Sequence, residues 1–146
     1  MLAKAAGFET PWLIPDLEDS VPAAEKAAAR AIVAEHIPTL VKAGKLLAPR
    51  VNSMTSGLAE DDITAVVSNE IIGISIGKIG NASEVKSLDQ ILTDAEIRAG
   101  VPVGKTMILP WLETAEAVIN AYEICISSDR IRWTAFGAED FSADMG

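Results

Sequence analysis

The sequence of 146 residues has few cysteines, histidines and basic side chains, and each shortage argues against a class of protein. Its one cysteine, Cys125, excludes an internal disulfide bond and a zinc cluster built from thiolates. Its one histidine, His36, lies near the end of a predicted helix, where we expect a structural or surface role rather than a zinc site or a histidine-based triad. Only 12 lysines and arginines stand against 21 aspartates and glutamates, a net charge of −9. Because a nucleic-acid surface needs a basic stripe, we expect no nucleic-acid partner.

Long apolar runs are also missing. No apolar stretch reaches the roughly 18 residues of a membrane span, and the N-terminal residues lack the charged-then-apolar order of a signal peptide. Hydrophobic residues nevertheless make up 49% of the sequence and charged residues 23%, which is a globular composition. We therefore expect a single, acidic, cytoplasmic domain over residues 1–146 that has no membrane partner.

The sequence does contain a regular alternation of short apolar runs and helical patterns. Five apolar runs, each ending in a polar or charged cluster, predict buried strands of a parallel sheet: Trp12–Asp19, Leu46–Asn52, Ile71–Lys78, Thr106–Glu113 and Ile131–Asp140. Four helical patterns lie between them: Ala23–His36, Gly57–Ser68, Asn81–Ala99 and Thr114–Ser127. Strands that alternate with helices predict an α/β fold with right-handed crossovers.

The spacing of the strand ends favours one α/β architecture. The ends at Asp19, Asn52, Lys78, Glu113 and Asp140 are 33, 26, 35 and 27 residues apart, close to the ~31 residues per unit of a (β/α)₈ barrel. A doubly wound sheet could show similar spacing, but every polar cluster falls at the carboxyl end of its strand, where barrel active sites are built. We predict a partial TIM (β/α)₈ barrel of about five β/α units, with no helix after the last strand. The unpaired edges of such a barrel disfavour an isolated monomer.

The polar side chains at the strand ends form the candidate site. In chain order they are Asp16, Glu18, Asp19, Arg50, Asn52, Lys78, Glu113 and Asp140. Carboxylates from separate strands that meet at one mouth are hard oxygen ligands, a set that suits Mg²⁺. A guanidinium on the same rim can hold a substrate carboxylate with two hydrogen bonds. The alternative is that these charges are helix caps and solvated loop residues.

The motifs around these residues resemble the citrate lyase β-subunit-like branch of the HpcH/HpaI aldolase/citrate lyase family. The matching stretches run from about residue 5 to the end: DLEDSV at Asp16–Val21, RVN at Arg50–Asn52, ETAEAVINA at Glu113–Ala121 and FGAEDFSADMG at Phe136–Gly146. The resemblance implies a (β/α)₈ barrel about twice this length, so that the first strand and the last two are absent here. It also implies Mg²⁺-dependent cleavage or formation of a carbon–carbon bond in an acyl-CoA such as malyl-, citramalyl- or citryl-CoA, with an acyl-CoA and an oxo acid as products.

The resemblance assigns a role to every residue of the candidate site except Asp16. Glu113 and Asp140 match the metal-binding carboxylates. Arg50 matches the arginine that holds the carboxylate of the oxo acid, and with Glu18 and Asp19 it makes up the predicted catalytic set. The predicted substrate-binding residues are Arg50, Asn52 and Lys78.

The sequence departs from the family pattern at two positions. Gly77 precedes Lys78 where the family commonly has proline. Trp111 replaces a smaller residue, and because it stands two residues before Glu113 it faces the same side of a strand and could narrow the pocket.

The resemblance leaves two other functions and the assembly open. The alternative enzyme is a class II aldolase that acts on free 4-hydroxy-2-oxo acids through a pyruvate enolate. That branch more often has a histidine after Asp-Leu-Glu, where this sequence has Asp19. The second alternative is an inactive fragment, since relatives take a further catalytic acid from a C-terminal part that is missing here. Relatives form trimers or hexamers, so we expect a homo-oligomer as well as an acyl-CoA or oxo-acid substrate.

Overall fold

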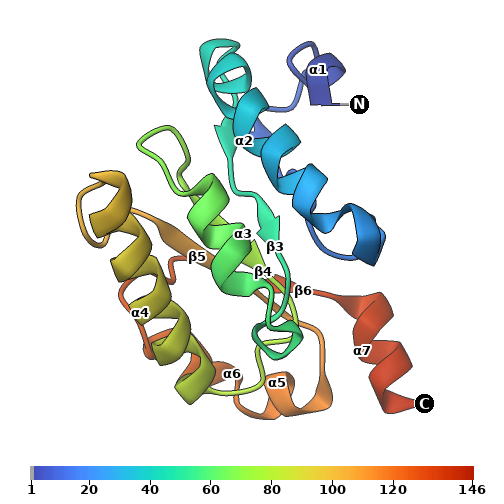
Figure 1. Cartoon of the computed structure of the whole chain (residues 1–146). Coiled ribbons are helices and arrows are strands. Elements are labelled where there is room, and N and C mark those ends of the chain that lie inside the picture. The colour runs from blue at the N-terminus through green and yellow to red at the C-terminus, as the bar shows by residue number, and fades with distance from the viewer. Residues whose placement is uncertain (1) are drawn as a thin grey trace.

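The computed structural model describes residues 2–146, in which short parallel strands alternate with helices along the chain (Figure 1). β1 (Trp12–Leu13) pairs in parallel with β2 (Leu46–Leu47), and a second parallel sheet has the order β3 (Arg50–Val51), β4 (Gly73–Ile76), β5 (Met107–Leu112) and β6 (Ala135–Phe136). An isolated bridge between Asp16 and Arg50 links the two sheets. The strands therefore follow one another in chain order, as in the wall of a barrel.

Helices alternate with the strands along the chain. They are α1 (Leu2–Ala5), α2 (Lys26–Lys42), α3 (Ala59–Val66), α4 (Ala82–Ala99), α5 (Ala115–Ile119), α6 (Ala121–Ile126) and α7 (Ala138–Met145), with 3₁₀ turns at Ala23–Glu25 and Met54–Ser56. α2, α3 and α4 pack side by side in chain order (Figure 1). None of the helices in residues 2–146 is both long and apolar enough to cross a membrane.

The core lies between the strands and these helices. β4 contributes Ile74 and Ile76, and α4 contributes Val85, Leu88 and Leu92, all of them fully buried. The α4 residues recur every three or four positions and so form one apolar face. The side chain of Asn81 caps the start of α4, and Gly100 ends it; Gly100 has a left-handed backbone (φ 67°) that glycine adopts readily.

Two predicted elements are interrupted. The strand Leu46–Asn52 is divided into β2 and β3 because Pro49 between them has no N–H for a ladder hydrogen bond. The helix Thr114–Ser127 is divided into α5 and α6 at Asn120, whose side-chain amide donates a hydrogen bond to the carbonyl of Gly80 (2.9 Å).

The end of the chain differs most from the prediction. The strand Ile131–Asp140 is reduced to β6, and the prediction that no helix follows it is wrong, because α7 begins at Ala138. Glu139 and Asp140 lie in the first turn of α7, where carboxylates interact favourably with the helix dipole. Asp140 therefore reaches the mouth of the sheet from a helix rather than from a strand end.

A buried ion-pair network supports β5 and β6 at their amino ends. The carboxylate of Glu96 in α4 accepts hydrogen bonds from Nη1 and Nη2 of Arg130 (2.9 and 2.8 Å) and from the backbone N–H groups of Gly104 and Thr106 (2.8 and 2.6 Å). Arg130 also donates through Nε to Asp89 (2.6 Å). Burial alone would raise the pKa of Glu96, but these hydrogen bonds lower it to about 2. The network ties α4 to the segments that lead into β5 and β6.

Candidate functional site

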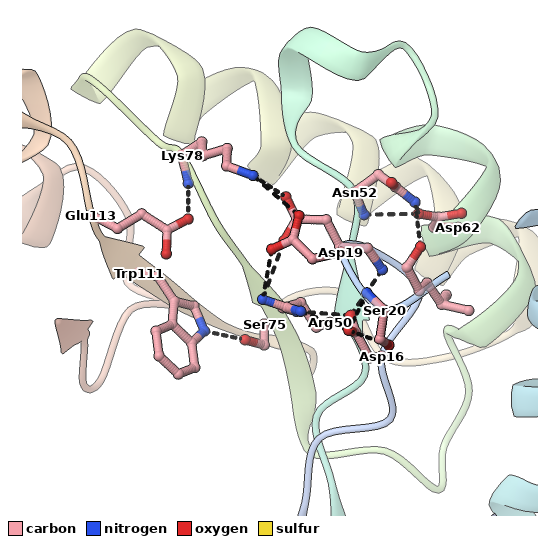
Figure 2. Close-up of polar contacts among 12 residues, drawn as sticks. Asp16, Asp19, Ser20, Arg50, Asn52, Asp62, Ser75, Lys78, Trp111 and Glu113 are labelled. Atoms are coloured by element: carbon pink, nitrogen blue, oxygen red, sulfur yellow. Dashed lines mark hydrogen bonds and ion pairs between the residues drawn. The ribbon is translucent and has the colours of Figure 1, made fainter. Parts of the chain in front are cut away.

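Charged side chains gather where the strands end at their carboxyl side (Figure 2). A cavity of about 560 Å³ opens there. Its lining residues are Asp19, Arg50, Trp111, Glu113, Phe136, Gly137, Ala138, Glu139 and Asp140. Arg50, Glu113 and Asp140, which lie far apart in the sequence, therefore meet at one cavity.

Arg50 is held in place by the acidic turn that follows β1. Its Nε and Nη2 donate to the two carboxylate oxygens of Asp16 (2.8 and 2.6 Å), while Nη1 lies farther from Asp19 (3.3 Å) and Glu18 (3.5 Å). Burial alone would raise the pKa of Asp16, but hydrogen bonds from Arg50, from Ser20 and from backbone N–H groups outweigh it and hold the pKa well below its usual range. Asp16 thus fixes one side of the guanidinium and leaves Nη1 directed toward the cavity.

Glu113 is buried in a space that two glycines leave for it. Its Oε1 accepts a hydrogen bond from the backbone N–H of Lys78 (2.9 Å). A Cβ atom on Gly137 would lie 2.6 Å from Oε2, and one on Gly77 would overlap Oε1. Burial, followed by the negative charges of Asp140 and Glu18, raises the pKa of Glu113 to about 7. Within residues 2–146, no lysine or arginine forms an ion pair with this carboxylate.

Lys78 touches both halves of the site. Its backbone has the left-handed conformation (φ 59°), which is uncommon for a residue other than glycine and which accompanies the hydrogen bond from its N–H to Glu113. Its Nζ lies 3.2 Å from Glu18 Oε1 and 3.4 Å from Asp19 Oδ1 (Figure 2). Burial alone would lower the pKa of Lys78, but these two carboxylates raise it.

Glu18 has a carboxylate oxygen with no hydrogen bond. The residue is 5% exposed, and its Oε2 is buried without a hydrogen-bond partner among the described residues. The charged group that pairs with this oxygen is Nη1 of Arg50 at 3.5 Å, which is an ion pair without a hydrogen bond. Buried polar atoms normally have hydrogen-bond partners, so this oxygen beside Glu113 can accept a further donor. No three acidic, cysteine or histidine side chains of residues 2–146 are arranged to enclose a metal ion by themselves. Mg²⁺ commonly binds through one or two carboxylates and keeps several waters, and Glu113 with Asp140 fits that requirement.

Asn52, a predicted site residue, does not line the cavity and is held by partners outside it. Its side-chain amide donates to the carbonyl of Leu17 (2.9 Å) and to Asp62 Oδ2 in α3 (2.6 Å), and the residue is buried (Figure 2). Asp62 also accepts a hydrogen bond from Arg30 in α2 (2.6 Å). In this structure Asn52 links the acidic turn to α3 instead of joining Arg50 at the mouth.

The sequence assigned no role to Asp16, although it holds Arg50. A signal was available, since Pro15 precedes Asp16 and Pro49 precedes Arg50 at the ends of neighbouring strands. The backbone N–H of Arg50 donates to the carbonyl of Pro15 (2.8 Å), so the two residues after these prolines lie side by side. The hydrogen bond from Trp111 Nε1 to Ser75 Oγ (2.6 Å) had no comparable signal, because it joins side chains of different strands.

Comparison with known sequences shows which proteins this chain resembles. The pattern that defines the HpcH/HpaI aldolase/citrate lyase family matches residues 1–146. The citrate lyase subunit beta of Leuconostoc mesenteroides subsp. cremoris is 37% identical over 145 residues, which cover 99% of this chain and 48% of that protein. The L-malyl-CoA/beta-methylmalyl-CoA lyase of Haloarcula marismortui is 32% identical over 153 residues, which cover 96% of this chain and 44% of that protein. The chain spans about half the length of the curated relatives it matches.

Solved structures share the fold. Malate synthase of Haloferax volcanii, solved as a lead(II) complex, superposes with a TM-score of 0.86 at 20% identity over 99% of this chain and 47% of that one. The protein CitE of Mycobacterium tuberculosis, solved in complex with magnesium and acetoacetate, superposes with a TM-score of 0.67 at 25% identity over 99% of this chain and 51% of that one. These likenesses confirm the predicted α/β fold as part of a (β/α)₈ barrel.

Proposed function

Because this chain belongs to the HpcH/HpaI aldolase/citrate lyase family, we propose that its site serves a Mg²⁺-dependent carbon–carbon lyase. The substrate class is an acyl-CoA thioester of the malyl-, citramalyl- or citryl-CoA type, and the products are an acyl-CoA and an oxo acid. Two relatives that match almost the whole chain have names that include a citrate lyase subunit and a malyl-CoA lyase. The observation that carries the proposal is the convergence of Glu113 and Asp140 beside the guanidinium of Arg50.

Glu113 and Asp140 would hold the magnesium ion. Their charges repel each other across a buried space, as the raised pKa of Glu113 indicates, and a divalent cation would offset that repulsion. Gly77 and Gly137 leave room for the Glu113 carboxylate, and the N–H of Lys78 fixes its orientation. When bound, the ion would supply Lewis-acid polarisation of substrate oxygen atoms.

Arg50 would bind the carboxylate of the oxo acid. Asp16 already occupies Nε and Nη2, so the donors available to a substrate are on Nη1, whose contacts with Asp19 and Glu18 are long. A substrate carboxylate there would form the shorter, charge-assisted hydrogen bonds that guanidinium groups favour. Arg50 would then act mainly by positioning the substrate against the carboxylates of the site.

Glu18 and Asp19 would order the polar groups between substrate and metal site. Both are tethered by Nζ of Lys78, and Oε2 of Glu18, which has no hydrogen bond and only a long ion pair with Arg50, can accept a hydrogen bond from water or from a substrate hydroxyl. We assign Lys78 to the positioning of these carboxylates as well as to substrate binding.

The test measures Mg²⁺ binding and turnover with the 146-residue chain. Isothermal titration should show that wild type binds Mg²⁺, that Glu113→Gln binds at least about tenfold more weakly, and that Glu123→Gln, an exposed control in α6, binds like wild type. Equal affinity of Glu113→Gln and wild type would refute the metal assignment. Mg²⁺-dependent cleavage of malyl-CoA would support the lyase, whereas cleavage of free 4-hydroxy-2-oxo acids alone would replace it with the aldolase.

A further inference from the structure

The proposed site has one large aromatic wall, Trp111. It lies in β5 two residues before Glu113, which directly follows that strand, and both side chains line the cavity with Arg50. The indole therefore forms part of the wall of the cavity that holds the group proposed to bind a carboxylate and the group proposed to bind the metal. It has no part in either role.

The indole is fixed by a hydrogen bond across the sheet. Its Nε1 donates to Ser75 Oγ in β4 at 2.6 Å (Figure 2), and Ser75 is fully buried. Ser75 is also the register partner of Arg50 in β3. If the ring moved away, the buried hydroxyl of Ser75 would lose this donor, which disfavours other rotamers. The ring thus stays next to Arg50.

We propose that Trp111 is a specificity-determining residue that restricts the oxo acid to two or three carbons. Among the proposed substrates this selects malyl- and citramalyl-CoA and excludes citryl-CoA, whose oxo acid, oxaloacetate, has four carbons. The inference rests on the proposed function, because it takes the carboxylate of the acid to bind Arg50 and its oxo end to face Glu113 and Asp140. An acid bound between Arg50 and Glu113 occupies the cavity that the indole lines, so a longer or branched substituent on its second carbon has less room beside a ring that Ser75 holds in place. Glyoxylate and pyruvate fit this description, and 2-oxobutanoate and 2-oxoisovalerate do not.

The experiment compares affinities for these four acids in the presence of Mg²⁺. Wild type should bind glyoxylate and pyruvate at least about tenfold more tightly than the two larger acids, since one methylene in a fitted pocket is worth about 10–200-fold. Trp111→Ala should reduce that ratio by about tenfold or more, and Trp111→Phe should retain most of it. Ser75→Ala, which keeps the indole but removes its acceptor, should give an intermediate ratio. Tyr122→Ala, which removes an exposed aromatic ring on α6, should leave the ratio unchanged.

The ratio separates specificity from a general structural effect. If Trp111→Ala and Ser75→Ala weaken all four acids equally, the indole only supports the fold and the inference is overturned, while the proposed function stands. Thermal melting of each variant identifies any that fails to fold, in which case the Trp111→Phe ratio decides. If wild type binds Mg²⁺ but none of the acids, the proposed function itself fails.

Discussion

Replacement of Glu96 by alanine should destabilise the protein strongly, although Glu96 lies far from the candidate site. The substitution removes four hydrogen bonds and leaves the guanidinium of Arg130 buried with only Asp89 as a charged partner. Removing one partner of a buried ion pair typically costs about 3–5 kcal/mol. Because Asp89 still pairs with Arg130 in the variant, we expect a cost near the lower end of this range. The lowered pKa gives a similar figure, since a change from 4.5 to about 2 corresponds to about 3 kcal/mol.

Urea unfolding at pH 7 measures this loss. We expect Glu96→Ala to lower the free energy of unfolding by about 3 kcal/mol, with a melting temperature about 6–12 °C lower than that of wild type. Glu35→Ala, which removes an exposed carboxylate from α2, should change the free energy of unfolding by less than about 0.5 kcal/mol. If Glu96→Ala and Glu35→Ala lower the free energy of unfolding by the same small amount, the ion-pair network around Arg130 contributes little to stability and the reasoning is wrong.

The same carboxylate predicts a dependence on pH. Because the pKa of Glu96 is lower in the folded protein than its ordinary value of 4.5, its stabilisation is fully present above about pH 4.5 and is lost as the pH falls toward 2. The difference in unfolding free energy between wild type and Glu96→Gln should therefore shrink steadily below pH 4.5. A difference that stays constant down to pH 2.5 would contradict the assigned pKa.

Two further predictions concern close packing at the two ends of the sheet. Gly137→Ala should weaken Mg²⁺ binding about 10–100-fold in a calorimetric titration, because the new Cβ would lie 2.6 Å from Glu113 Oε2 and would displace that carboxylate. The control is Gly7→Ala, whose new Cβ would lie 3.6 Å from its nearest neighbouring atom. This variant should bind Mg²⁺ as wild type does. Trp12 and Trp133 form an edge-to-face pair with ring centroids 5.6 Å apart. A double-mutant cycle of the two alanine variants should therefore give a coupling free energy of about 0.5–1.5 kcal/mol. A coupling free energy near zero would show that the rings do not stabilise each other.

The sequence predicted the order of strands and helices because that order depends on local patterns. α4 is the clearest case, since a capping asparagine, an apolar face and a terminal glycine all lie within one stretch. The stretch Gly137–Gly146 was harder, because residues such as Phe141 and Met145 continue an apolar pattern after the strand without a strong helix signal. There the helix forms in a segment whose packing partners, including α5, are distant in sequence.

The candidate site was predicted to the level of which residues meet, but not how each side chain is held. Arg50 lies in β3 and Glu113 directly follows β5, and the common direction of parallel strands brings the strand ends together. The orientation of Asn52 depends on Asp62, ten residues later and in a helix, and so it was not visible in the strand pattern. The same holds for Trp111, whose partner Ser75 lies in the neighbouring strand.

The buried charge clusters at the two ends of this sheet differ in how their charges are balanced. At the amino ends of β5 and β6, the carboxylates of Glu96 and Asp89 both bind Arg130, and the pKa of Glu96 is lowered. At the carboxyl ends, Glu113 has only a backbone N–H, faces other carboxylates, and has a raised pKa. A cluster that serves stability alone gains nothing from unbalanced negative charge in a buried space, since desolvation and repulsion both oppose it. The imbalance around Glu113 is therefore the physical reason to locate the chemistry at the carboxyl end and to assign the amino end to support of the fold.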